Sequence, residues 1–324
     1  MNANGQSSKI LQYVGVLIVA ITLNFLLPRL MPGNPLELLA GAEVGMMSPQ
    51  ERQQVIEAVG LDRPLHMQYI KYIGDVLTGN FGYSYRQSRP IIDMIAERLP
   101  WTLFLASSSL ILSAFIGIVL GALAALRRGR PFDILMYNTM IVIDSLPSFW
   151  IGMLGIAIFA VRLGLLPSQG AVTPASGYQG IEYFRDVLEH AILPIATLSI
   201  VSTPRIFLMM RYTMIGVIGE DFIRTARSKG LTERSILAKH TIPNALIPVV
   251  TVLALRFGYA FGGTVVIETV FSYPGLGRLI FEAVRGRDYP VMQAGFLLIT
   301  IAVLASNLFA DWLYPKLDPR VRAP

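Results

Sequence analysis

Residues 101–126 read WTLFLASSSLILSAFIGIVLGALAAL, a run of 26 residues without one charged side chain. An α-helix needs about 20 such residues to cross a hydrocarbon core of about 30 Å, so this run predicts a transmembrane helix. Five further runs carry at most two charges each: 10–27, 134–161, 191–210, 244–270 and 291–310. The sequence therefore predicts an all-α membrane protein with six transmembrane helices.

The composition favours a membrane protein over a soluble one. Hydrophobic residues make up 53% of the 324 residues and charged residues only 15%, and the mean hydropathy is +0.55. A soluble chain normally carries about 25% charged residues. A soluble protein with six buried core helices is the alternative, but runs of this length without a polar face argue against it. The absence of cysteine excludes disulfides and thiolate metal sites.

The first apolar run, 10–27, resembles a signal peptide in its position and in the preceding Lys9. However, 18 residues is long for the apolar part of such a peptide, and residues 28–32 (PRLMP) offer no small-residue cleavage site. We therefore interpret this run as a retained first span.

The distribution of lysine and arginine between the spans predicts the orientation. With the amino terminus in the cytoplasm, the inner segments are 1–9, 127–133, 211–243 and 311–324, and the outer segments are 31–100, 162–190 and 271–290. The inner segments hold 13 basic and 6 acidic residues, whereas the longer outer segments hold 11 basic and 13 acidic ones. Basic residues concentrate on the cytoplasmic side, so both termini are predicted to be cytoplasmic. The formal net charge of +6 follows from this distribution and requires no nucleic-acid partner.

The outer segment 31–98 is predicted to be a small helical region. Ser48-Pro49-Gln50-Glu51 has the pattern of a capping box with proline at the first helical position, and this helix should end near Gly60. A second helix is expected over 64–78 and a third, short one over 90–98. Their apolar faces are too short for a separate core, so we expect them on the membrane surface or against the outer ends of the spans.

Charged residues inside the predicted spans are candidates for a transport role, because charges in the bilayer pair or face a wet cavity. Asp144 and Arg256 lie about 15 Å and about 18 Å from the cytoplasmic ends of their spans, at 1.5 Å per residue. We predict that they pair with each other or line the translocation path. Arg205 is expected to reach the inner surface and Glu268 the outer interface, both in structural roles.

Motifs for catalysis are missing from the sequence. It contains no G-x-x-x-x-G-K-[ST] phosphate loop, no H-E-x-x-H and no G-x-S-x-G. The three histidines, His66, His190 and His240, lie outside the predicted spans and are interpreted as local structural residues. No catalytic residue, metal site or cofactor is therefore predicted in this chain.

The loop 220–243 between the fourth and fifth spans predicts two helices joined by a turn. The first is expected over 220–229, with Gly230 ending it, and Thr232 should cap a second helix that runs through His240 and stops before Pro243. Phe222, Ile223 and Ala226 would give the first helix an apolar side next to basic residues. Such a surface suits a docking partner, while an amphipathic loop resting on anionic lipid is the alternative.

The same loop resembles a known motif. The sequence RTA at 224–226, Gly230 and HTIP at 240–243 resembles the E-A-A-x3-G-x9-I-x-L-P loop of ABC importer permeases, with Ala226, Gly230 and Pro243 matching in register. The departures, among them Arg224 in place of glutamate, resemble the peptide-type branch with its R-T-A-x-x-K-G pattern. Further stretches agree with that branch: MPGNP at 31–35, LDRPL at 61–65, GNFG at 79–82, ETVFSYPGLG at 268–277, DYP at 288–290 and LDPR at 317–320.

The resemblance implies a permease subunit of an ATP-driven, binding-protein-dependent importer with the type I ABC importer permease fold. It implies a bacterial inner (plasma) membrane location, a second homologous permease chain, two cytoplasmic ATPase subunits that bind ATP and Mg, and an extracytoplasmic substrate-binding protein. The chain would then divide into a first span with its outer segment (1–97), a five-span permease core (98–313) and a cytoplasmic tail (314–324). The ATPase-coupling residues implied are Arg224, Thr225, Ala226, Gly230, His240, Ile242 and Pro243.

The substrate implied by this branch is a peptide, with nickel chelates, opines or oligosaccharides as alternatives on the same machinery. Two other classes of protein are disfavoured by the sequence. An ion-coupled secondary transporter more often shows twelve spans or inverted repeats, and a membrane scaffold would not need charges inside its spans.

Overall fold

The computed structural model describes residues 3–30, 36, 47–59, 61–84 and 86–317. It divides into two compact units, each built from two stretches of the chain. Unit 1 comprises Met1–Leu103 and Pro274–Ala305, and unit 2 comprises Phe104–Tyr273 and Ser306–Pro324. Residues 274–305 thus group with the amino-terminal region by their contacts, and the sequence-based division into 1–97, 98–313 and 314–324 stays a prediction.

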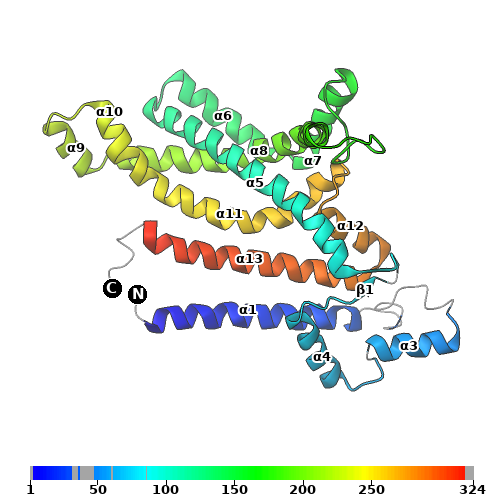
Figure 1. The fold of residues 1–324 in the computed structure, drawn as a ribbon. Coiled ribbons are helices and arrows are strands. Elements are labelled where there is room, and N and C mark those ends of the chain that lie inside the picture. Colours follow the sequence, from blue (N-terminus) through cyan, green and yellow to red (C-terminus); the bar gives the residue numbers. More distant parts are fainter. Residues whose placement is uncertain (1–2, 31–35, 37–46, 60, 85, 318–324) are drawn as a thin grey trace. The chain divides into compact units, whose positions relative to one another are not determined.

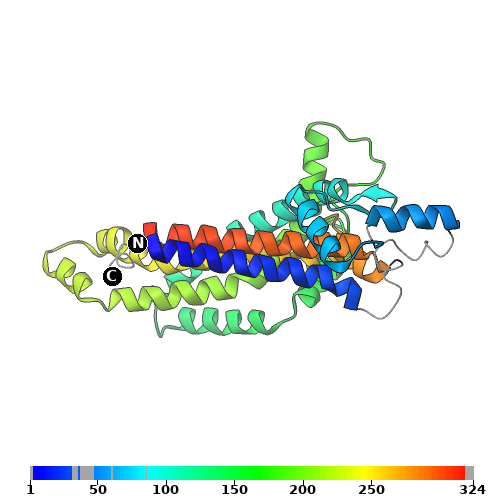
Figure 2. The same ribbon diagram turned by 90° about the horizontal axis from the view of Figure 1, so that it is seen from below.

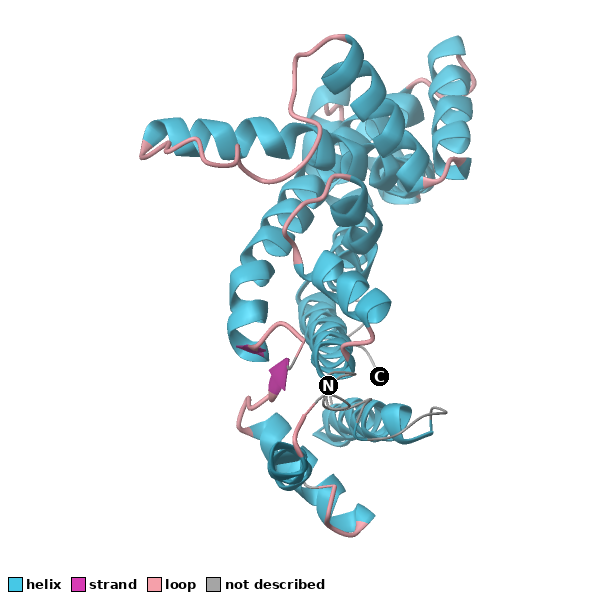
Figure 3. Ribbon diagram, turned by 90° about the vertical axis from the view of Figure 1, so that its right-hand side faces the viewer, coloured by secondary structure: helices cyan, strands magenta, loops and turns pink. Residues whose placement is uncertain are grey.

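Unit 1 is helical apart from one short hairpin. Its elements are α1 (Ala3–Leu30), α3 (Pro49–Val59), α4 (Leu65–Leu77), β1 (Tyr83–Ser84), β2 (Arg89–Pro90), the start of α5 (Ile91–Leu126), α12 (Leu276–Gly286) and the start of α13 (Tyr289–Leu317). The strands β1 and β2 pair antiparallel, and they are the strands found in the described part of the chain (Figure 3). Helix α1 lies alongside the start of α13 (Figures 1 and 2), where Asn24 Nδ2 donates to the Gln293 carbonyl at 2.7 Å.

The helices predicted after the first span are present, with one difference. The Ser48 backbone N–H donates to Glu51 at 2.8 Å and Ser48 Oγ accepts from the Glu51 N–H at 3.3 Å, which confirms the capping box. The hydrogen bonds from Ser48 also hold the pKa of Glu51 below its usual value. The third predicted helix, over 90–98, is wrong as a separate element, because α5 runs without a break from Ile91 to Leu126 and includes Pro100.

The core of unit 1 explains why Pro100 does not end that helix. Ile91, Met94 and Ile95 are buried against α12 and the start of α13. Proline removes one intrahelical hydrogen bond, and burial of these three side chains offsets that loss. Helix α12 supplies the facing apolar side, and the sequence analysis did not predict it.

Unit 2 contains the remaining helices. They are the rest of α5, α6 (Pro131–Ser145), α7 (Ser148–Gly155), η2 (Ile156–Arg162), α8 (Ile181–Ile218), α9 (Asp221–Ser228), α10 (Glu233–Ile236), η3 (Leu237–Thr241), α11 (Ile242–Val270) and the end of α13. Helices α5 and α8 approach closely at Gly121, where a Cβ atom would lie 2.7 Å from the Phe207 carbonyl oxygen. This close approach fits the role of small residues at helix contacts in membranes.

Four of the predicted spans are present as long apolar helices, and a fifth is broken. Four stretches in the described residues are each long and apolar enough to cross a bilayer: Ile91–Leu126, Ile181–Ile218, Glu233–Arg256 and Tyr289–Trp312. The third predicted span, 134–161, is broken, since α6 and the α7–η2 segment meet at an angle of 99°. The break falls at Leu146, which precedes Pro147 and is extended (φ −85°, ψ 136°) because proline disfavours helical geometry in the residue before it. Helix α1 carries a shorter apolar stretch, Leu11–Leu27.

Candidate functional site

Residues 220–243, which we call the knuckle, form a compact helical turn at one end of unit 2. Figure 1 shows α9 and α10 beyond the ends of α8 and α11. Gly230 has φ +77° and separates the two short helices, and Thr232 Oγ1 accepts from the Ser235 N–H at 3.4 Å as the cap of the second. A left-handed φ is a conformation that only glycine adopts at little cost, so the predicted turn at Gly230 is confirmed.

The knuckle has its own small core. Ile223 and Ala226 of α9 are buried against Ile236 of α10 and Val217 of α8. The predicted apolar docking side is therefore largely used internally, because two of its three residues face the knuckle core. Phe222 and Leu231 remain exposed as the apolar part of the surface.

Charged side chains cover the rest of the knuckle. Arg227 and Glu233 form a two-point ion pair across the turn, with Arg227 Nε 2.7 Å and Nη2 3.3 Å from the two carboxylate oxygens. Arg224 donates to Asp221 at 3.2 Å, and Thr225 Oγ1 donates to the Asp221 carbonyl at 3.0 Å. The Arg227–Glu233 pair joins α9 to α10, whereas the contacts to Asp221 lie within α9.

The end of the knuckle differs from the prediction. Pro243 does not stop the second helix, because α10, the π-helical turn η3 and α11 follow one another without a break. Proline cannot donate to the carbonyl four residues earlier. The π-helical turn and the Asn244 side chain, which donates to the His240 carbonyl at 2.6 Å, adjust the hydrogen bonding at this point. Ile242 packs on the cluster formed by α5, α8 and α11, and His240 is half-buried.

A cavity of about 420 Å³ lies between the knuckle and the ends of α5 and α8. Its lining includes Leu126 at the end of α5, Ile218 at the end of α8, and Arg227 and Glu233 of the knuckle. The knuckle is thus rigid internally but is not packed tightly against every neighbouring helix.

An ion pair that the sequence analysis did not predict joins α6 to α8 near the knuckle. Arg211 Nε and Nη2 donate to the two carboxylate oxygens of Asp133 at 2.6 and 2.8 Å, and the Gly129 N–H donates to the same carboxylate at 2.9 Å. The side chains are only 14% and 2% exposed. The pair fixes the Pro131 end of α6 to the last turns of α8.

The charges predicted inside the spans are close together, but they pair differently from the prediction. Asp144 forms its ion pair with Arg205, whose Nε lies 3.3 Å from Oδ1, and not with Arg256. Arg256 of α11 lies within charge–charge range of both residues. The expectation that Arg205 reaches the inner surface in a structural role stays a prediction, to which the structure adds its ion pair with Asp144. Glu268, predicted at the outer interface, is fully buried near the end of α11.

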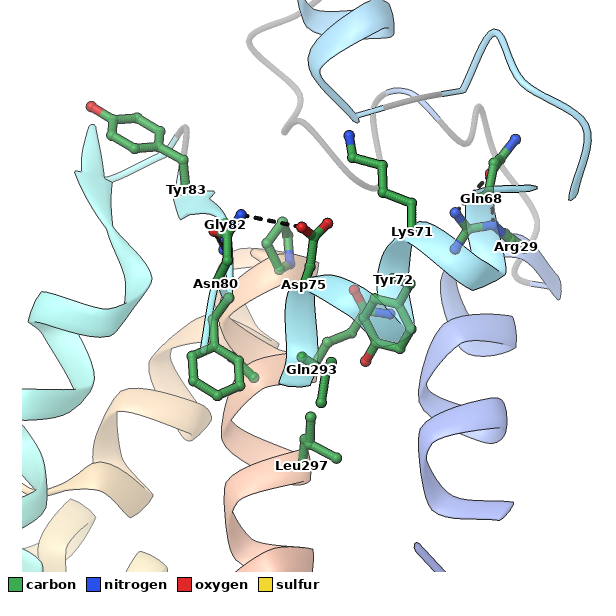
Figure 4. A pocket seen from close by; sticks show the side chains of 14 residues that line it. Arg29, Gln68, Lys71, Tyr72, Asp75, Asn80, Gly82, Tyr83, Gln293 and Leu297 are labelled. Atoms are coloured by element: carbon green, nitrogen blue, oxygen red, sulfur yellow. Dashed lines mark hydrogen bonds between the residues drawn. The ribbon is translucent and has the colours of Figure 1, made fainter. Parts of the chain in front are cut away.

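Unit 1 contains a cavity of about 330 Å³ with both polar and apolar side chains on its wall, which we call the α4 pocket. Figure 4 shows Arg29 and Gln68 at one edge, Asp75 and Asn80 at the other, and Leu297 of α13 below. The described acceptors of the Arg29 guanidinium are neutral: Gln68 Oε1 at 2.8 and 3.2 Å and the Phe25 carbonyl at 2.8 Å. Burial raises the pKa of Tyr72, on the wall of the pocket, to about 12.

Comparison with protein families decides the identity. Residues 117–323 match the family described as "Binding-protein-dependent transport system inner membrane component". Residues 8–106 match the family that describes the N-terminal part of such membrane components. The chain belongs to this permease family. It is an ABC importer permease of the peptide type, which confirms the resemblance in the knuckle motif.

Curated relatives of this permease match over nearly the whole chain. The glutathione transport system permease protein GsiC of Salmonella paratyphi A is 39% identical over 97% of both chains. The dipeptide transport system permease protein DppB of Escherichia coli is 37% identical over 97% of this chain and 98% of its own length.

Solved structures share the fold of the permease at lower identity. A chain of the inward-facing methionine ABC transporter MetNI is 20% identical with a TM-score of 0.55, over 69% of this chain and 96% of that one. A chain of an amino acid ABC transporter is 15% identical with a TM-score of 0.53, over 69% and 94%. At these identities the likeness shows the fold alone.

Membership in the family has direct consequences for the permease. It is an inner membrane component, and its family works together with an ATPase and a substrate-binding protein. ATP hydrolysis in this family belongs to the partner subunits.

Proposed function

We propose that this permease forms half of the translocation pathway of an ATP-driven importer for peptides. The observation that carries the proposal is the 37–39% identity, over 97% of the chain, to permeases named for dipeptide and glutathione transport. Nickel chelates, opines and oligosaccharides are the alternative substrates. The names of the relatives favour peptides, and the second half of the pathway would be a homologous permease chain.

The proposed topology has six spans with both termini in the cytoplasm. Counting α1 and the bent α6–α7–η2 pair as one span each adds two to the four long apolar candidates. The excess of basic residues in the knuckle and the other inner segments supports this orientation. It places the knuckle in the cytoplasm and the α4 pocket outside.

The knuckle is proposed as the contact with the ATPase. Its internal core and ion pairs make it stiff enough to pass a movement of the ATPase to α8 and α11. Arg224, Thr225 and Gly230 lie on its exposed surface together with Pro243. Ala226 would act from inside, by letting α9 pack closely on α10, and His240 and Ile242 would connect the knuckle to α11. ATP and Mg would be bound by two ATPase subunits.

The α4 pocket is proposed to face the substrate-binding protein. It lies outside in the proposed topology, and Arg29 presents a partly buried cation whose described partners are all neutral. A partly buried charge is stabilised by an opposite charge, so an acidic side chain of the binding protein would suit it.

A pair of glycine variants tests the assignment of the knuckle. Gly230→Val and Gly177→Val both place a branched side chain at a positive φ, with open space around the new Cβ atom. Only Gly230→Val should release the ATPases on gentle solubilisation or uncouple ATP hydrolysis from peptide uptake. If the ATPases do not co-purify with the unaltered permease in intact complexes, the proposal fails.

A further inference from the structure

Three charged side chains of unit 2 lie at similar depths. Depth here is measured along each helix from the helix end nearest the knuckle. Asp144 follows the start of α6 at Pro131, Arg205 precedes the end of α8 at Ile218, and Arg256 follows the start of α11 at Ile242. Each is separated from that helix end by about 13 or 14 residues, which is about 20 Å along the axis. These three helix ends lie on one side of the unit. The Asp133–Arg211 pair joins the start of α6 to the last turns of α8, and the knuckle joins the end of α8 to the start of α11.

The three residues form a group with one excess positive charge. Arg205 and Asp144 are paired through a single 3.3 Å contact, and their side chains are 67% and 38% exposed. Arg256 lies within charge–charge range of both. The group therefore holds two guanidinium groups and one carboxylate, which of the two contacts only Arg205, and it retains the capacity to bind a second anion.

Such a group cannot face lipid. Charged side chains inside a membrane span face a water-filled cavity or another protein surface. The backbone supports the same conclusion independently, because the 99° break after α6 lies two residues from Asp144. Non-helical backbone at membrane depth is found where it lines a cavity or is buried in protein, and broken helices often form substrate sites in transporters.

We propose that Asp144, Arg205 and Arg256 form a binding site on the translocation pathway for the free carboxylate end of a peptide. The planar guanidinium matches a carboxylate with two parallel N–H donors, and Asp144 is the group that would receive the amino end of a short zwitterionic peptide. This inference rests on the proposed function, and it adds the chemical group that the permease itself recognises.

The test uses the complete complex of permeases and ATPases in lipid nanodiscs. The probes are L-alanyl-L-alanine and its C-terminal amide, which differ only in the negative charge. Binding to the complex without the binding protein is measured by saturation-transfer NMR, and ATP-driven uptake is measured in proteoliposomes with the binding protein present. Arg256→Gln removes the charge, Arg256→Lys keeps it, and Arg162→Gln is the control at an exposed arginine outside the group.

The free dipeptide should bind the unaltered complex more tightly than the amide. Arg256→Gln should weaken binding of the free dipeptide about 10- to 100-fold, which is the value of a charge-assisted hydrogen bond, and leave binding of the amide unchanged. Arg256→Lys should restore most of the lost affinity, and Arg162→Gln should have no effect.

Three results would overturn the proposal. Equal binding of the two peptides would show that the carboxylate is not recognised, and a lack of dipeptide binding would show that no site exists. If Arg256→Gln separates the two permease chains instead, the group pairs with an acidic residue of the partner permease. Failure of the unaltered complex to take up the dipeptide with ATP and binding protein would instead contradict the proposed function itself.

Discussion

Helices α6 and α8 are joined by two Asp–Arg ion pairs that differ in almost every physical respect. The Asp133–Arg211 pair has two short contacts, a third bond from the Gly129 backbone, and side chains that are almost completely buried. The Asp144–Arg205 pair has one longer contact and two exposed side chains. The same two residue types on the same two helices therefore form two different contacts. We call the buried Asp133–Arg211 contact the closed pair and the exposed Asp144–Arg205 contact the open pair.

The difference separates a structural role from a binding role. A buried ion pair whose atoms are all satisfied holds two helices together, and removing one partner leaves an uncompensated buried charge. An exposed pair contributes little to stability, and its open side remains available to a ligand. The closed pair lies next to the knuckle, where stiffness is needed, and the open pair lies deeper in the proposed pathway.

Removal of the Asp133 charge should have the largest effect on stability. In Asp133→Asn, Arg211 keeps its charge in a mostly buried position without a counter-ion, at a cost of about 3–5 kcal/mol. Thermal unfolding of the purified permease in detergent, followed by size-exclusion chromatography, measures the loss. The double variant Asp133→Asn with Arg211→Gln should recover a large part of it, because no buried charge remains.

Asp144→Asn is the matched variant at the open pair. It should change the stability by less than about 1 kcal/mol, because both side chains are exposed and stay solvated after the pair is broken. A loss as large as that of Asp133→Asn would mean that the Asp144 group is buried in the membrane protein, and the contrast between the two levels would be wrong.

Glycine substitutions sharpen the same contrast through packing. Gly121 lies at the level of the closed pair, where a Cβ atom would meet the Phe207 carbonyl at 2.7 Å and the Arg211 N–H group at 3.2 Å. Gly121→Ala should therefore destabilise the permease by about 1–3 kcal/mol. Gly155 of α7 also faces α8, but the nearest atom to its Cβ is a flexible Leu193 methyl at 3.8 Å.

Gly155→Ala should consequently stabilise the permease, whereas Gly121→Ala destabilises it. Alanine is favoured over glycine inside a helix by about 1 kcal/mol, and the contact at 3.8 Å costs nothing. Both variants are measured by the same thermal unfolding assay. Equal effects of the two variants would show that the close approach of α5 and α8 does not limit the packing.

Local signals in the sequence predicted the local elements well. The capping box at Ser48 and the turn at Gly230 each depend on a few neighbouring residues, and both are present in the structure. The apolar runs predicted the helices for the same reason, since the length of a run is a local property. The helix break at Leu146 has a local signal in Pro147, but the sequence-based prediction did not divide the span there.

Contacts between distant residues were not predictable from one sequence. Asp133 lies just outside a predicted span and Arg211 just after another, so neither signalled a buried partner. Counting residues from the cytoplasmic ends of the spans gave similar depths for Asp144 and Arg256. The count did not show that Arg205 of α8 would be the ion-pair partner of Asp144. Depth along a helix says nothing about the direction in which a side chain points, and that direction decides the pairing.

The Arg227–Glu233 pair of the knuckle provides the smallest expected effect and a third case for comparison. Both side chains are exposed although the pair has two contacts, so a double-mutant cycle with Arg227→Ala and Glu233→Ala should give a coupling energy of about 0.2–1 kcal/mol in the isolated permease. An ATPase bound over the knuckle would remove water from this pair. The coupling energy should then rise above about 2 kcal/mol in the complete complex, as charge pairs at protein interfaces do, whereas an equal value with and without the ATPase would place the contact elsewhere.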